Sequence, residues 1–392
     1  MSESNISGRA AIVGLGATEF SKNSGRTELR LALEATLAAL KDAGIDPSEV
    51  EGFSSYSVDK VPEYEIARNL GAKNVKFFSQ IPHGGGAACA PVLHAAMAVA
   101  TGMAKVMVVY RAMNERSWYR FGTGSYGFGA TPIFDNVNYG WYMPHGFHTP
   151  AAWVGMFARR YMHRYGATSE DFGRVAVAVR DFAATNPAAF FHGKPITLAE
   201  HQASKWIAEP LHLLDCCQES DGAVAMVITS AERAKDMKNK PVLIKAASQG
   251  ITTGQQSMTS FFREDITGLP EMGVVAKELY AQSGLGPQDF QTAVIYDHFT
   301  PFVLTQLEEF GFCPRGEAKE FVRAGHHARG GKLPINTHGG QLGEAYIHGF
   351  NGVAEGVRQV RGSAVNQVAD VRNVLVTAGT GVPTSGLILG CV

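Results

Sequence analysis

A short segment of this chain occurs twice, 240 residues apart. Residues 44–50 read GIDPSEV and residues 284–290 read GLGPQDF. Each copy follows an amphipathic segment that predicts a helix, and each precedes an apolar run that predicts a strand. In both copies a glycine follows the helix and a proline opens a short turn. A chain that repeats such a unit is expected to fold as two similar halves.

A second correspondence follows each copy. Residues 83–86, which read HGGG, precede a predicted helix and a strand at residues 106–110. Residues 336–340, which read NTHGG, precede a predicted helix and a strand at residues 374–377. Continuous apolar strands that alternate with helices are typical of a sheet covered on both faces. The sequence therefore predicts an α/β fold built from two duplicated β-α-β halves.

The two halves divide near a charged segment that ends at residue 240. We expect an N-terminal half over residues 1–240 and a C-terminal half over residues 241–392. Residues from about 112 to 210 have no counterpart in the second half and are rich in Gly, Pro and aromatic side chains. This stretch is expected to be an inserted loop domain. In the second half, the apolar run at residues 293–296 predicts the strand after the repeated segment.

Composition narrows the class of protein. Apolar residues make up 45% of the chain and charged residues 18%, so a large buried core is expected. The formal net charge is −1, which excludes a global positive field that would attract nucleic acid or anionic membranes. Five cysteines without a C-x-x-C pair indicate neither a disulfide framework nor a structural zinc site, and the N-terminus lacks a signal-peptide pattern. We expect a cytoplasmic protein.

Several segments together resemble the thiolase family, and within it the sterol carrier protein-x or lipid-transfer protein branch. Besides the duplication and the insertion, the resemblance rests on residues 186–187 (NP), 195–197 (PIT), 217–225 (CQESDGAVA) and the glycine-rich run at 336–352. It covers essentially the whole chain. The resemblance implies a five-layer α-β-α-β-α thiolase fold, a homodimer and an acyl-CoA substrate.

The positions that carry thiolase chemistry differ in this chain. The family's nucleophilic cysteine falls at Gly85, and Cys89 lies four residues further on, one turn inside a predicted helix. Tyr296 occupies the first position of the family's second motif, and Tyr346 stands where the activating histidine belongs. The segment at residues 374–383 holds no second catalytic cysteine. Claisen condensation and thiolysis need a thiolate that carries the acyl group, so we expect neither reaction.

Two phenols without a nucleophile suit a reaction that moves protons and breaks a carbon–carbon bond. Retro-aldol cleavage of a β-hydroxyacyl-CoA needs a base for the β-hydroxyl, donors for the thioester enolate and an acid that protonates Cα. We predict that Tyr296 and Tyr346 are the acid–base pair, in an order that the sequence leaves open. The predicted supporting and oxyanion groups are two nearby histidines and backbone amides of glycine turns: His298, His348, Gly85, Gly379 and Gly381.

The closer resemblance is to the thiolase-like aldolases of actinobacterial steroid side-chain degradation. It implies cleavage of a 17-hydroxy steroid C22-CoA ester into a 17-ketosteroid and propionyl-CoA. It also implies a complex with a small zinc-ribbon/OB-fold acyl-CoA-binding protein, in an α2β2 assembly. No cofactor is expected in this chain, and zinc would belong to the partner. On this resemblance the protein is a carbon–carbon lyase of lipid catabolism.

Two other functions stay open at this point. An acetyl-CoA acyltransferase would use Cys89 as its nucleophile, and a non-catalytic lipid or acyl-CoA carrier would need neither tyrosine. Arg159 and Arg160, on a predicted amphipathic helix, either form a solvated face or contact the phosphates of CoA. The aromatic-rich loop at residues 118–142 either packs at an interface or lines an apolar tunnel. Two pairs of histidines, at residues 145 and 148 and at residues 326 and 327, come without a supporting carboxylate or cysteine cluster, so no metal is expected.

Overall fold

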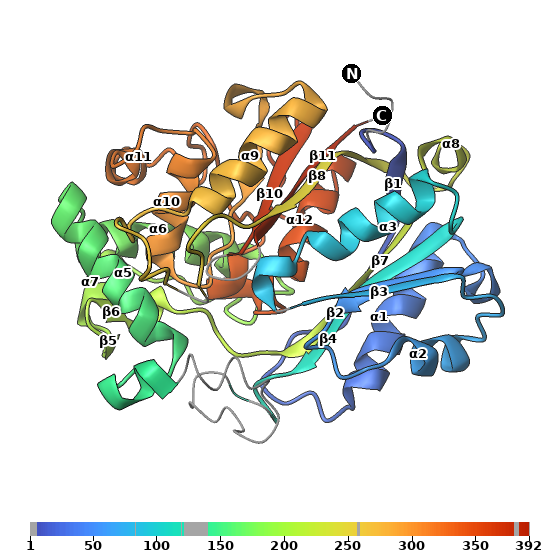
Figure 1. Ribbon diagram of the computed structural model, residues 1–392, viewed down its shortest axis with the longest axis horizontal. Helices are drawn as coiled ribbons and strands as arrows, with labels where there is room; N and C mark the ends of the chain where they lie inside the picture. Colours follow the sequence, from blue (N-terminus) through green and yellow to red (C-terminus); the bar gives the residue numbers. More distant parts are fainter. Residues whose placement is uncertain are drawn as a thin grey trace.

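One mixed sheet runs through the protein, with helices on both sides (Figure 1). The computed structural model describes residues 6–82, 84–118, 120, 140–256, 259–379 and 384–391. Within these ranges, nine strands form the sheet in the order β3-β2-β4-β7-β1-β8-β11-β10-β9. The strand bounds are β1 (Ala10–Ala17), β2 (Gly52–Tyr56), β3 (Phe77–Ile81), β4 (Val106–Asn114), β7 (Asp221–Ser230), β8 (Val242–Gly250), β9 (Thr292–Val294), β10 (Asn373–Ala378) and β11 (Thr384–Gly390).

The strand order repeats from one half of the sheet to the other. In the first half, β1 pairs antiparallel with β7, β7 antiparallel with β4, and β4 parallel with β2. In the second half, β8 pairs antiparallel with β11, β11 antiparallel with β10, and β10 parallel with β9. The halves join where β1 and β8 pair antiparallel, Ala11 with Leu243 and Ile12 with Val242. The predicted duplication is therefore present in the sheet, while the predicted domain boundaries stay a prediction.

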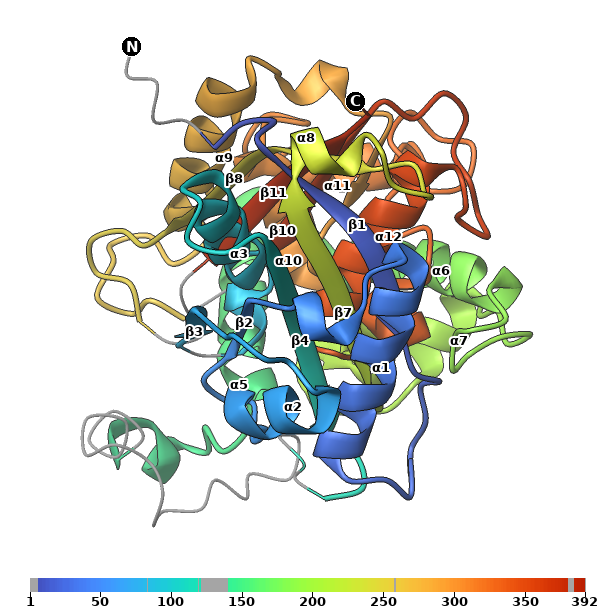
Figure 2. The ribbon, with the colours of Figure 1, turned by 90° about the vertical axis from the view of Figure 1, so that its right-hand side faces the viewer.

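Helices form three layers around the two halves of the sheet. The helices α1 and α2 cover the outer face of the first half (Figure 2), and α3 and α12 lie between the halves. The helices α9 and α10 cover the outer face of the second half. Buried apolar side chains sort into three separate clusters that follow these layers. This is the α-β-α-β-α arrangement that the resemblance to thiolases implies.

The helices of these layers are short to medium in length. Their bounds are α1 (Glu28–Ala43), α2 (Glu63–Leu70), α3 (Ala90–Ala100), α8 (Ala231–Ala234), α9 (Pro270–Ser283), α10 (Thr300–Glu309), α11 (Ala318–Arg323) and α12 (Phe350–Arg361). None of the helices in the described part of the chain has both the length and the apolar character needed to cross a membrane.

The repeated segment forms the same local structure in both halves. Gly44 ends α1 and Gly284 ends α9, both with a left-handed backbone at φ of 69° and 70°. Each glycine is followed by a short 3-10 turn, Pro47–Glu49 and Pro287–Asp289. In each turn, the carboxylate of the last residue accepts the N–H of the residue before the proline. The glycine and proline positions of the repeated segment therefore mark helix ends and caps in the structure.

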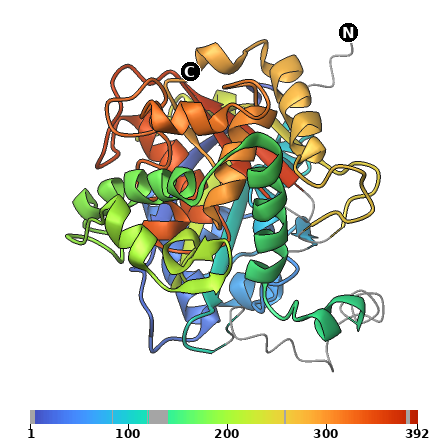
Figure 3. The same ribbon diagram turned by 90° about the vertical axis from the view of Figure 1, so that its left-hand side faces the viewer.

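Between β4 and β7 the chain makes an excursion whose described residues, 115–118, 120 and 140–220, lie outside the nine-stranded sheet. Figure 3 shows this excursion in green on the outer side of the second half, where its helices share an apolar cluster with α9 and α10. Most of the aromatic-rich loop at residues 118–142 lies outside the described residues. The elements of the excursion are α5 (Pro150–Tyr165), α6 (Ser169–Thr185), α7 (Leu198–Ala203), β5 (Trp206–Ala208) and β6 (Leu211–His212).

The strand after the second repeat copy is shorter than predicted. The sequence predicted a strand through residue 296, but β9 ends at Val294. The Ile295 N–H donates to Asn336 Oδ1 at 2.8 Å, and the Tyr296 N–H donates to Thr377 Oγ1 at 3.0 Å. Side chains of neighbouring segments replace the strand partner at these positions. As a result, Tyr296 leaves the sheet and enters the central layer.

Candidate active site

Two tyrosines meet in the central layer. Tyr296 follows β9, and Tyr346 follows a π-helical turn over Gly340–Glu344. Their hydroxyl oxygens lie 3.3 Å apart. Tyr296 is 3% exposed, and Tyr346 packs against the same central apolar cluster. The structure therefore brings together the two residues that the sequence predicts as the acid–base pair, and their catalytic roles stay a prediction.

Gly85 lies directly against this pair. It begins the 3-10 turn Gly85–Ala87, and a Cβ added to it would lie 1.5 Å from the Tyr296 hydroxyl oxygen. Because a close-packed interior does not accommodate such an overlap, any side chain at this position would displace the tyrosine. Gly349 faces the same ring, since an added Cβ would lie 2.7 Å from Tyr296 Cε2. The Tyr296 hydroxyl thus fills the space that a nucleophilic side chain at Gly85 would need.

His348 connects the pair to a buried ion pair. Arg111 Nε donates to His348 Nδ1 at 3.2 Å, and Arg111 Nη1 lies 3.1 Å from Asp59 Oδ2. The His348 ring meets the Tyr346 ring edge-on, with centroids 5.1 Å apart. Burial, together with the charge of Arg111, lowers the pKa of His348 well below its ordinary value. The imidazole is therefore neutral at physiological pH and orients the tyrosine without adding charge.

His298 lies beside the other tyrosine. Its ring centroid is 4.7 Å from that of Tyr296, and it stacks on Phe302 with an interplanar angle of 8°. Burial lowers the pKa of His298 to about 3, so this imidazole is also neutral. Neither predicted supporting histidine supplies positive charge. Among the described residues, Arg111 is a buried cation close to the pair, since it donates a hydrogen bond to His348.

Burial keeps both phenols protonated. The pKa of a free tyrosine is about 10. Burial raises the pKa of Tyr296, and the hydrogen bond with Tyr346 only partly offsets this effect. Burial also raises the pKa of Tyr346 well above its ordinary value. Two neutral phenols in contact can pass a proton between them, but either becomes a base only when another group takes its proton.

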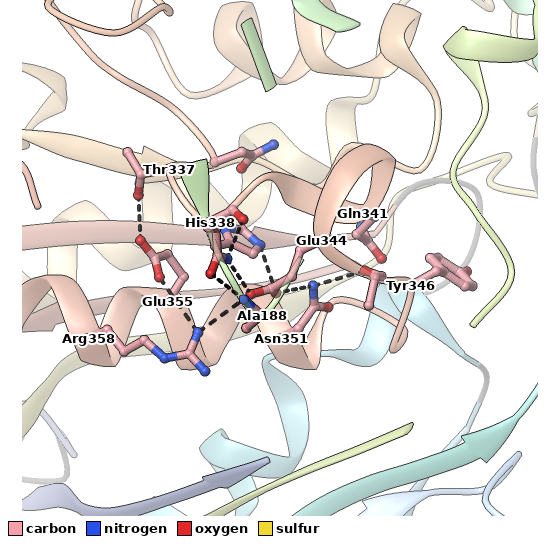
Figure 4. Close-up of polar contacts among 12 residues, drawn as sticks. Ala188, Thr337, His338, Gln341, Glu344, Tyr346, Asn351, Glu355 and Arg358 are labelled. Carbon is pink, nitrogen blue, oxygen red and sulfur yellow. Dashed lines mark hydrogen bonds and ion pairs between the residues drawn. The ribbon is translucent and has the colours of Figure 1, made fainter. Parts of the chain in front are cut away.

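A buried polar network holds the loop that carries Tyr346 (Figure 4). The Glu344 carboxylate accepts hydrogen bonds from Asn351 Nδ2 at 3.0 Å and from Asn186 Nδ2 at 3.1 Å. Asn351 Nδ2 also donates to the Ala345 carbonyl at 2.9 Å, directly before Tyr346. Two amides, one on α12 and one at the end of α6, therefore fix the backbone on which the tyrosine stands.

A second carboxylate extends this network. Arg358 Nη1 lies 3.9 Å from Glu344 Oε1 and 3.7 Å from Glu355 Oε2, and Thr337 Oγ1 donates to Glu355 at 2.6 Å (Figure 4). Burial raises the pKa of Glu344 to about 7, although Arg358 opposes this effect. Burial lowers the pKa of His338 to about 3, which leaves its ring neutral beside Glu344. The loop is thus supported by a carboxyl group, that of Glu344, whose pKa lies close to neutral pH.

Comparison with known proteins assigns the chain to a family. The family model described as thiolase C-terminal domain-like matches residues 252–390. A steroid side-chain-cleaving aldolase from Thermomonospora curvata is 63% identical, over 98% of each chain. A 17-hydroxy-3-oxo-4-pregnene-20-carboxyl-CoA lyase from Mycobacterium tuberculosis is also 63% identical, over 98% of this chain and 100% of that protein. This chain belongs to the thiolase superfamily, among its steroid side-chain aldolases.

A solved structure supports the same assignment. The structure named Ltp2-ChsH2(DUF35) aldolase superposes with a TM-score of 0.95 at 62% identity, over 98% of both chains. The resemblance to thiolase-like aldolases predicted from the sequence is therefore confirmed. In this member of the aldolase family, the thiolase fold carries the paired phenols of Tyr296 and Tyr346. It has Gly85 at the position of the nucleophilic cysteine.

The predicted oxyanion amides are only partly within the described structure of this aldolase family member. Gly85 stands at the start of the turn that leads into α3, and Gly379 directly follows β10. An added Cβ on Gly379 would lie 2.5 Å from Thr384 Oγ1, so the backbone passes close to β11 there. Gly381 lies outside the described residues. The oxyanion role of these amides stays a prediction.

Cys89 is not placed as the sequence predicted. It was expected one turn inside a helix, but α3 begins at Ala90 and Cys89 is its N-cap residue, because a 3-10 turn precedes the helix. The side chain is fully buried, and its Sγ donates to the Val376 carbonyl at 3.7 Å. Burial raises the pKa of the Cys89 thiol. A neutral, enclosed thiol is a poor nucleophile, which argues against the acyltransferase alternative.

The arginines predicted to bind CoA lie on the solvent side of α5. Arg159 and Arg160 are both exposed, and Arg159 Nη2 forms an ion pair with Glu209 Oε1 at 2.7 Å. An exposed pair of this kind holds the side chain weakly. Neither arginine has a contact with the tyrosine pair among the described hydrogen bonds and ion pairs. Their role in CoA binding stays a prediction.

Metal ligands do not gather in the described part of this family member. Among its described residues, no group of three or more His, Cys, Asp or Glu side chains is arranged to hold a metal ion. The polar side chains near the tyrosines are instead engaged with one another, as in the contacts of Arg111 with His348 and Asp59.

Sequence reasoning missed several groups near the tyrosine pair. Arg111 and Glu115 are charged residues in, and directly after, the apolar strand β4, and both are almost fully buried. A charge inside an apolar run was the signal that could have marked them. Ser220, whose Oγ accepts the Tyr346 N–H at 3.1 Å, lies in a loop and gave no such signal.

Proposed function

We propose that this protein cleaves a 17-hydroxy steroid C22-CoA thioester by a retro-aldol reaction, giving a 17-ketosteroid and propionyl-CoA. The observation that carries the proposal is the pair of hydroxyls on Tyr296 and Tyr346, 3.3 Å apart, beside Gly85, where a side chain does not fit. Two relatives named for steroid side-chain cleavage are 63% identical over nearly the whole chain. Paired phenols without a thiolate favour proton transfer over acyl transfer.

The proposed reaction uses each phenol once. One tyrosine, as the phenolate left when another group has taken its proton, accepts the β-hydroxyl proton as the Cα–Cβ bond breaks, and the electron pair of that bond forms the thioester enolate. The other phenol gives its proton to Cα, and transfer between the two hydroxyls restores their protonation. Backbone amides of Gly85 and Gly379 stabilise the enolate oxygen in this scheme. Neutral His348 and His298 hold the tyrosine rings in place.

Access for the CoA part of the substrate is proposed at α5. Arg159 and Arg160 are exposed there, and guanidinium groups bind phosphates through charge-assisted hydrogen bonds. The ion pair of Arg159 with Glu209 is exposed and can exchange for a phosphate at small cost. This part of the proposal concerns binding and not the chemical step.

We further propose that the working enzyme is a homodimer that binds two copies of a small zinc-ribbon/OB-fold acyl-CoA-binding partner. In favour of a partner, the solved structure at 62% identity carries the name Ltp2-ChsH2(DUF35) aldolase. In favour of a homodimer, β3 is an edge strand of the sheet, and its Phe78 is 63% exposed. Unpaired strand edges with exposed apolar residues are ready partners for another chain.

The proposed chemistry needs no cofactor in this chain. The CoA thioester is the substrate, and every proton transfer uses protein side chains, so zinc would belong to the partner. All five cysteines are free thiols, which is consistent with a reducing compartment. We therefore propose that the enzyme works in the cytoplasm.

Mass-spectrometric product analysis tests the proposed function. The purified protein, with and without the zinc-ribbon/OB-fold partner, is incubated with a 17-hydroxy steroid C22-CoA thioester. We expect propionyl-CoA and the 17-ketosteroid from the wild type, and a loss of about 10²–10⁴-fold in Tyr296→Phe and Tyr346→Phe. Cys89→Ala is the matched control and should keep its turnover. No cleavage with the partner present, or a loss in Cys89→Ala alone, would contradict the proposal and favour a carrier or an acyltransferase.

A further inference from the structure

The excursion between β4 and β7 ends with residues 215–220, here called the return segment. One side of this segment is bonded to the chain that directly follows Tyr296. The Cys217 N–H donates to the His298 carbonyl at 2.8 Å, and the residue before Cys217 forms an isolated antiparallel bridge with Phe299. The return segment therefore holds the backbone that leads from Tyr296 into α10.

The other side of the return segment is bonded to the loop that carries Tyr346, which Figure 4 shows together with Gln341. The Gln218 N–H donates to the Gln341 carbonyl at 3.3 Å, and Ser220 Oγ accepts the Tyr346 N–H at 3.1 Å. Ser220 is buried, and a backbone N–H that is enclosed needs a partner of this kind. The same short segment is thus bonded to both stretches of chain that carry the tyrosines.

A buried carboxyl group anchors the return segment. Asp215 Oδ1 accepts a hydrogen bond from Thr300 Oγ1, at the start of α10, and lies 2.9 Å from His201 Nε2. Asp215 Oδ2 accepts the His212 N–H at 2.8 Å. All four residues are enclosed, each at 2% exposed or less. Because both carboxyl oxygens are satisfied in the interior, this anchor fixes Thr300, four residues after Tyr296, to the return segment.

The contact between the two tyrosine hydroxyls is long. Their oxygens lie 3.3 Å apart, whereas O–H···O hydrogen bonds are usually about 2.5–3.0 Å long. A further contact joins the two backbones, since Asp297 Oδ1 accepts the Gln341 N–H at 2.9 Å. A long hydroxyl contact holds its partners weakly, so the position of each hydroxyl depends on the backbone contacts behind it.

We propose that the return segment fixes the distance between the hydroxyls of Tyr296 and Tyr346, with Ser220 and Thr300 as positioning residues. Ser220 places the backbone of Tyr346, and Thr300, through Asp215, ties the chain after Tyr296 to the same segment. This inference rests on the proposed function and adds to it two residues that act through the backbone of the pair. The excursion then contributes to the chemical step, besides carrying the arginines proposed to bind CoA.

Two substitutions at position 300 test the anchor in the complex of the enzyme with its proposed partner. Thr300→Val keeps the shape of the side chain but removes the hydroxyl that donates to Asp215, whereas Thr300→Ser keeps the hydroxyl. We expect kcat to fall about 10-fold to 100-fold in Thr300→Val, with KM within about twofold, because a misplacement of about 1 Å costs about 100-fold in rate. Thr300→Ser should keep kcat within about threefold of the wild type.

Thr305→Val is the matched control on the same helix. Thr305 is as fully buried as Thr300, but its hydroxyl makes no hydrogen bond with any residue that the structure describes. The same substitution there should leave kcat and KM within about twofold of the wild type. An equal loss of kcat in both variants would mean that any such change in α10 lowers turnover, which would overturn the role of Thr300.

Ser220→Ala tests the other side of the return segment, and double variants identify what both sides act on. Ser220→Ala should also lower kcat about 10-fold to 100-fold at unchanged KM. Neither change should lower kcat further where the hydroxyl that it places is already absent, which is Thr300→Val in Tyr296→Phe and Ser220→Ala in Tyr346→Phe. A merely structural role would lower kcat by the same factor in every background, and that outcome would overturn the inference.

A geometric measurement separates this inference from the proposed function. In a crystal structure of Ser220→Ala, we expect the two hydroxyl oxygens to lie further apart than the 3.3 Å of the wild type, and in Thr305→Val at the wild-type distance. An unchanged distance in Ser220→Ala would overturn the inference whatever the turnover. An inactive wild-type complex, with the distance changed as expected, would contradict the proposed function alone.

Discussion

The two halves of the molecule carry a tyrosine at the same place and use it differently. Tyr56 and Tyr296 are 240 positions apart, which is the spacing of the repeated segment. Tyr56 ends β2, and Tyr296 comes two residues after the end of β9. The Tyr56 hydroxyl is buried and makes no hydrogen bond with a described residue, whereas the Tyr296 hydroxyl contacts Tyr346. One position of the repeat thus serves packing in the first half and faces the candidate site in the second.

The difference lies in the neighbours of each ring. Tyr56 meets Phe350 edge-on, with ring centroids 5.9 Å apart, and the Arg111 guanidinium lies 5.6 Å from its ring centroid. Tyr296 instead faces Gly85 at its hydroxyl and Gly349 at its ring. The duplicated fold therefore supplies two equivalent tyrosine positions. Around Tyr296, the glycines at positions 85 and 349 leave room for its ring and hydroxyl beside Tyr346.

The largest expected effect separates the two tyrosines. Tyr296→Phe removes a hydroxyl from the pair and should lower kcat by about 10²–10⁴-fold. Tyr56→Phe removes a buried hydroxyl that has no described partner, so kcat should stay within about twofold and stability should not fall. Steady-state kinetics and thermal unfolding of both variants check this. Equal losses of turnover would show that the two positions are functionally alike.

Gly85→Ala should have the next largest effect. The added methyl overlaps the Tyr296 hydroxyl and forces the ring to move, and a displacement of about 1 Å at a reacting group costs about 100-fold in rate. Overpacking should also cost about 1–3 kcal/mol of stability. The control is Gly140→Ala, where an added Cβ meets no atom within 4 Å. Kinetics and denaturant unfolding of both variants measure the effects, and wild-type turnover in Gly85→Ala would refute the overlap.

The free energy of unfolding should also depend on pH through a buried carboxyl group of the C-terminal half, that of Asp297. Burial raises the pKa of Asp297 to about 7, above the value of about 4 that an unfolded chain gives. The folded state therefore favours the protonated form, and this contribution is present at low pH and lost as pH rises towards 7. Asp297→Asn should reduce the fall in the free energy of unfolding between about pH 5 and pH 7 by on the order of 2 kcal/mol. Urea unfolding at both pH values measures it, and an unchanged slope would contradict the assignment.

The smallest expected effect concerns the support of the Tyr346 loop. Asn351→Ala removes the amide that donates to Glu344 and to Ala345, and leaves two buried acceptors without it. We expect about 1–2 kcal/mol lower stability and about tenfold lower kcat, because Tyr346 loses a fixed backbone. The matched control in the first half is Asn69→Ala, whose amide donates to an exposed helix carbonyl. Similar losses in both variants would mean that the network does not position the loop.

Much of the framework could be predicted from the sequence, because local rules act there. The helix ends at Gly44 and Gly284 follow from glycine and proline spacing, and the structure confirms them. The proximity of Tyr296 and Tyr346 followed from their places in two family motifs. These features depend on short segments or on motif positions, which a single sequence displays directly.

The remaining features depend on contacts between distant segments. The Arg111–His348 hydrogen bond joins residues 237 positions apart, and no local pattern indicates it. The early end of β9 arises because the Asn336 side chain takes the Ile295 N–H in place of a strand. Buried polar side chains are satisfied by whatever the tertiary fold places beside them. For this reason the sequence located the tyrosines and the two histidines beside them, but not the charged and amide side chains that support them.

The overlap between Gly85 and Tyr296 has an evolutionary consequence. Gly85→Cys alone would drive a side chain into the tyrosine hydroxyl, and replacing Tyr296 alone would remove a phenol while adding no nucleophile. We therefore expect each single step towards acyl transfer to give a protein that performs neither reaction. Positions 85 and 296, which are 211 residues apart, would have to change together, in addition to the histidine and the second cysteine that thiolase chemistry also needs. Selection can therefore refine the present chemistry step by step, but it can reverse that chemistry only through a non-functional intermediate.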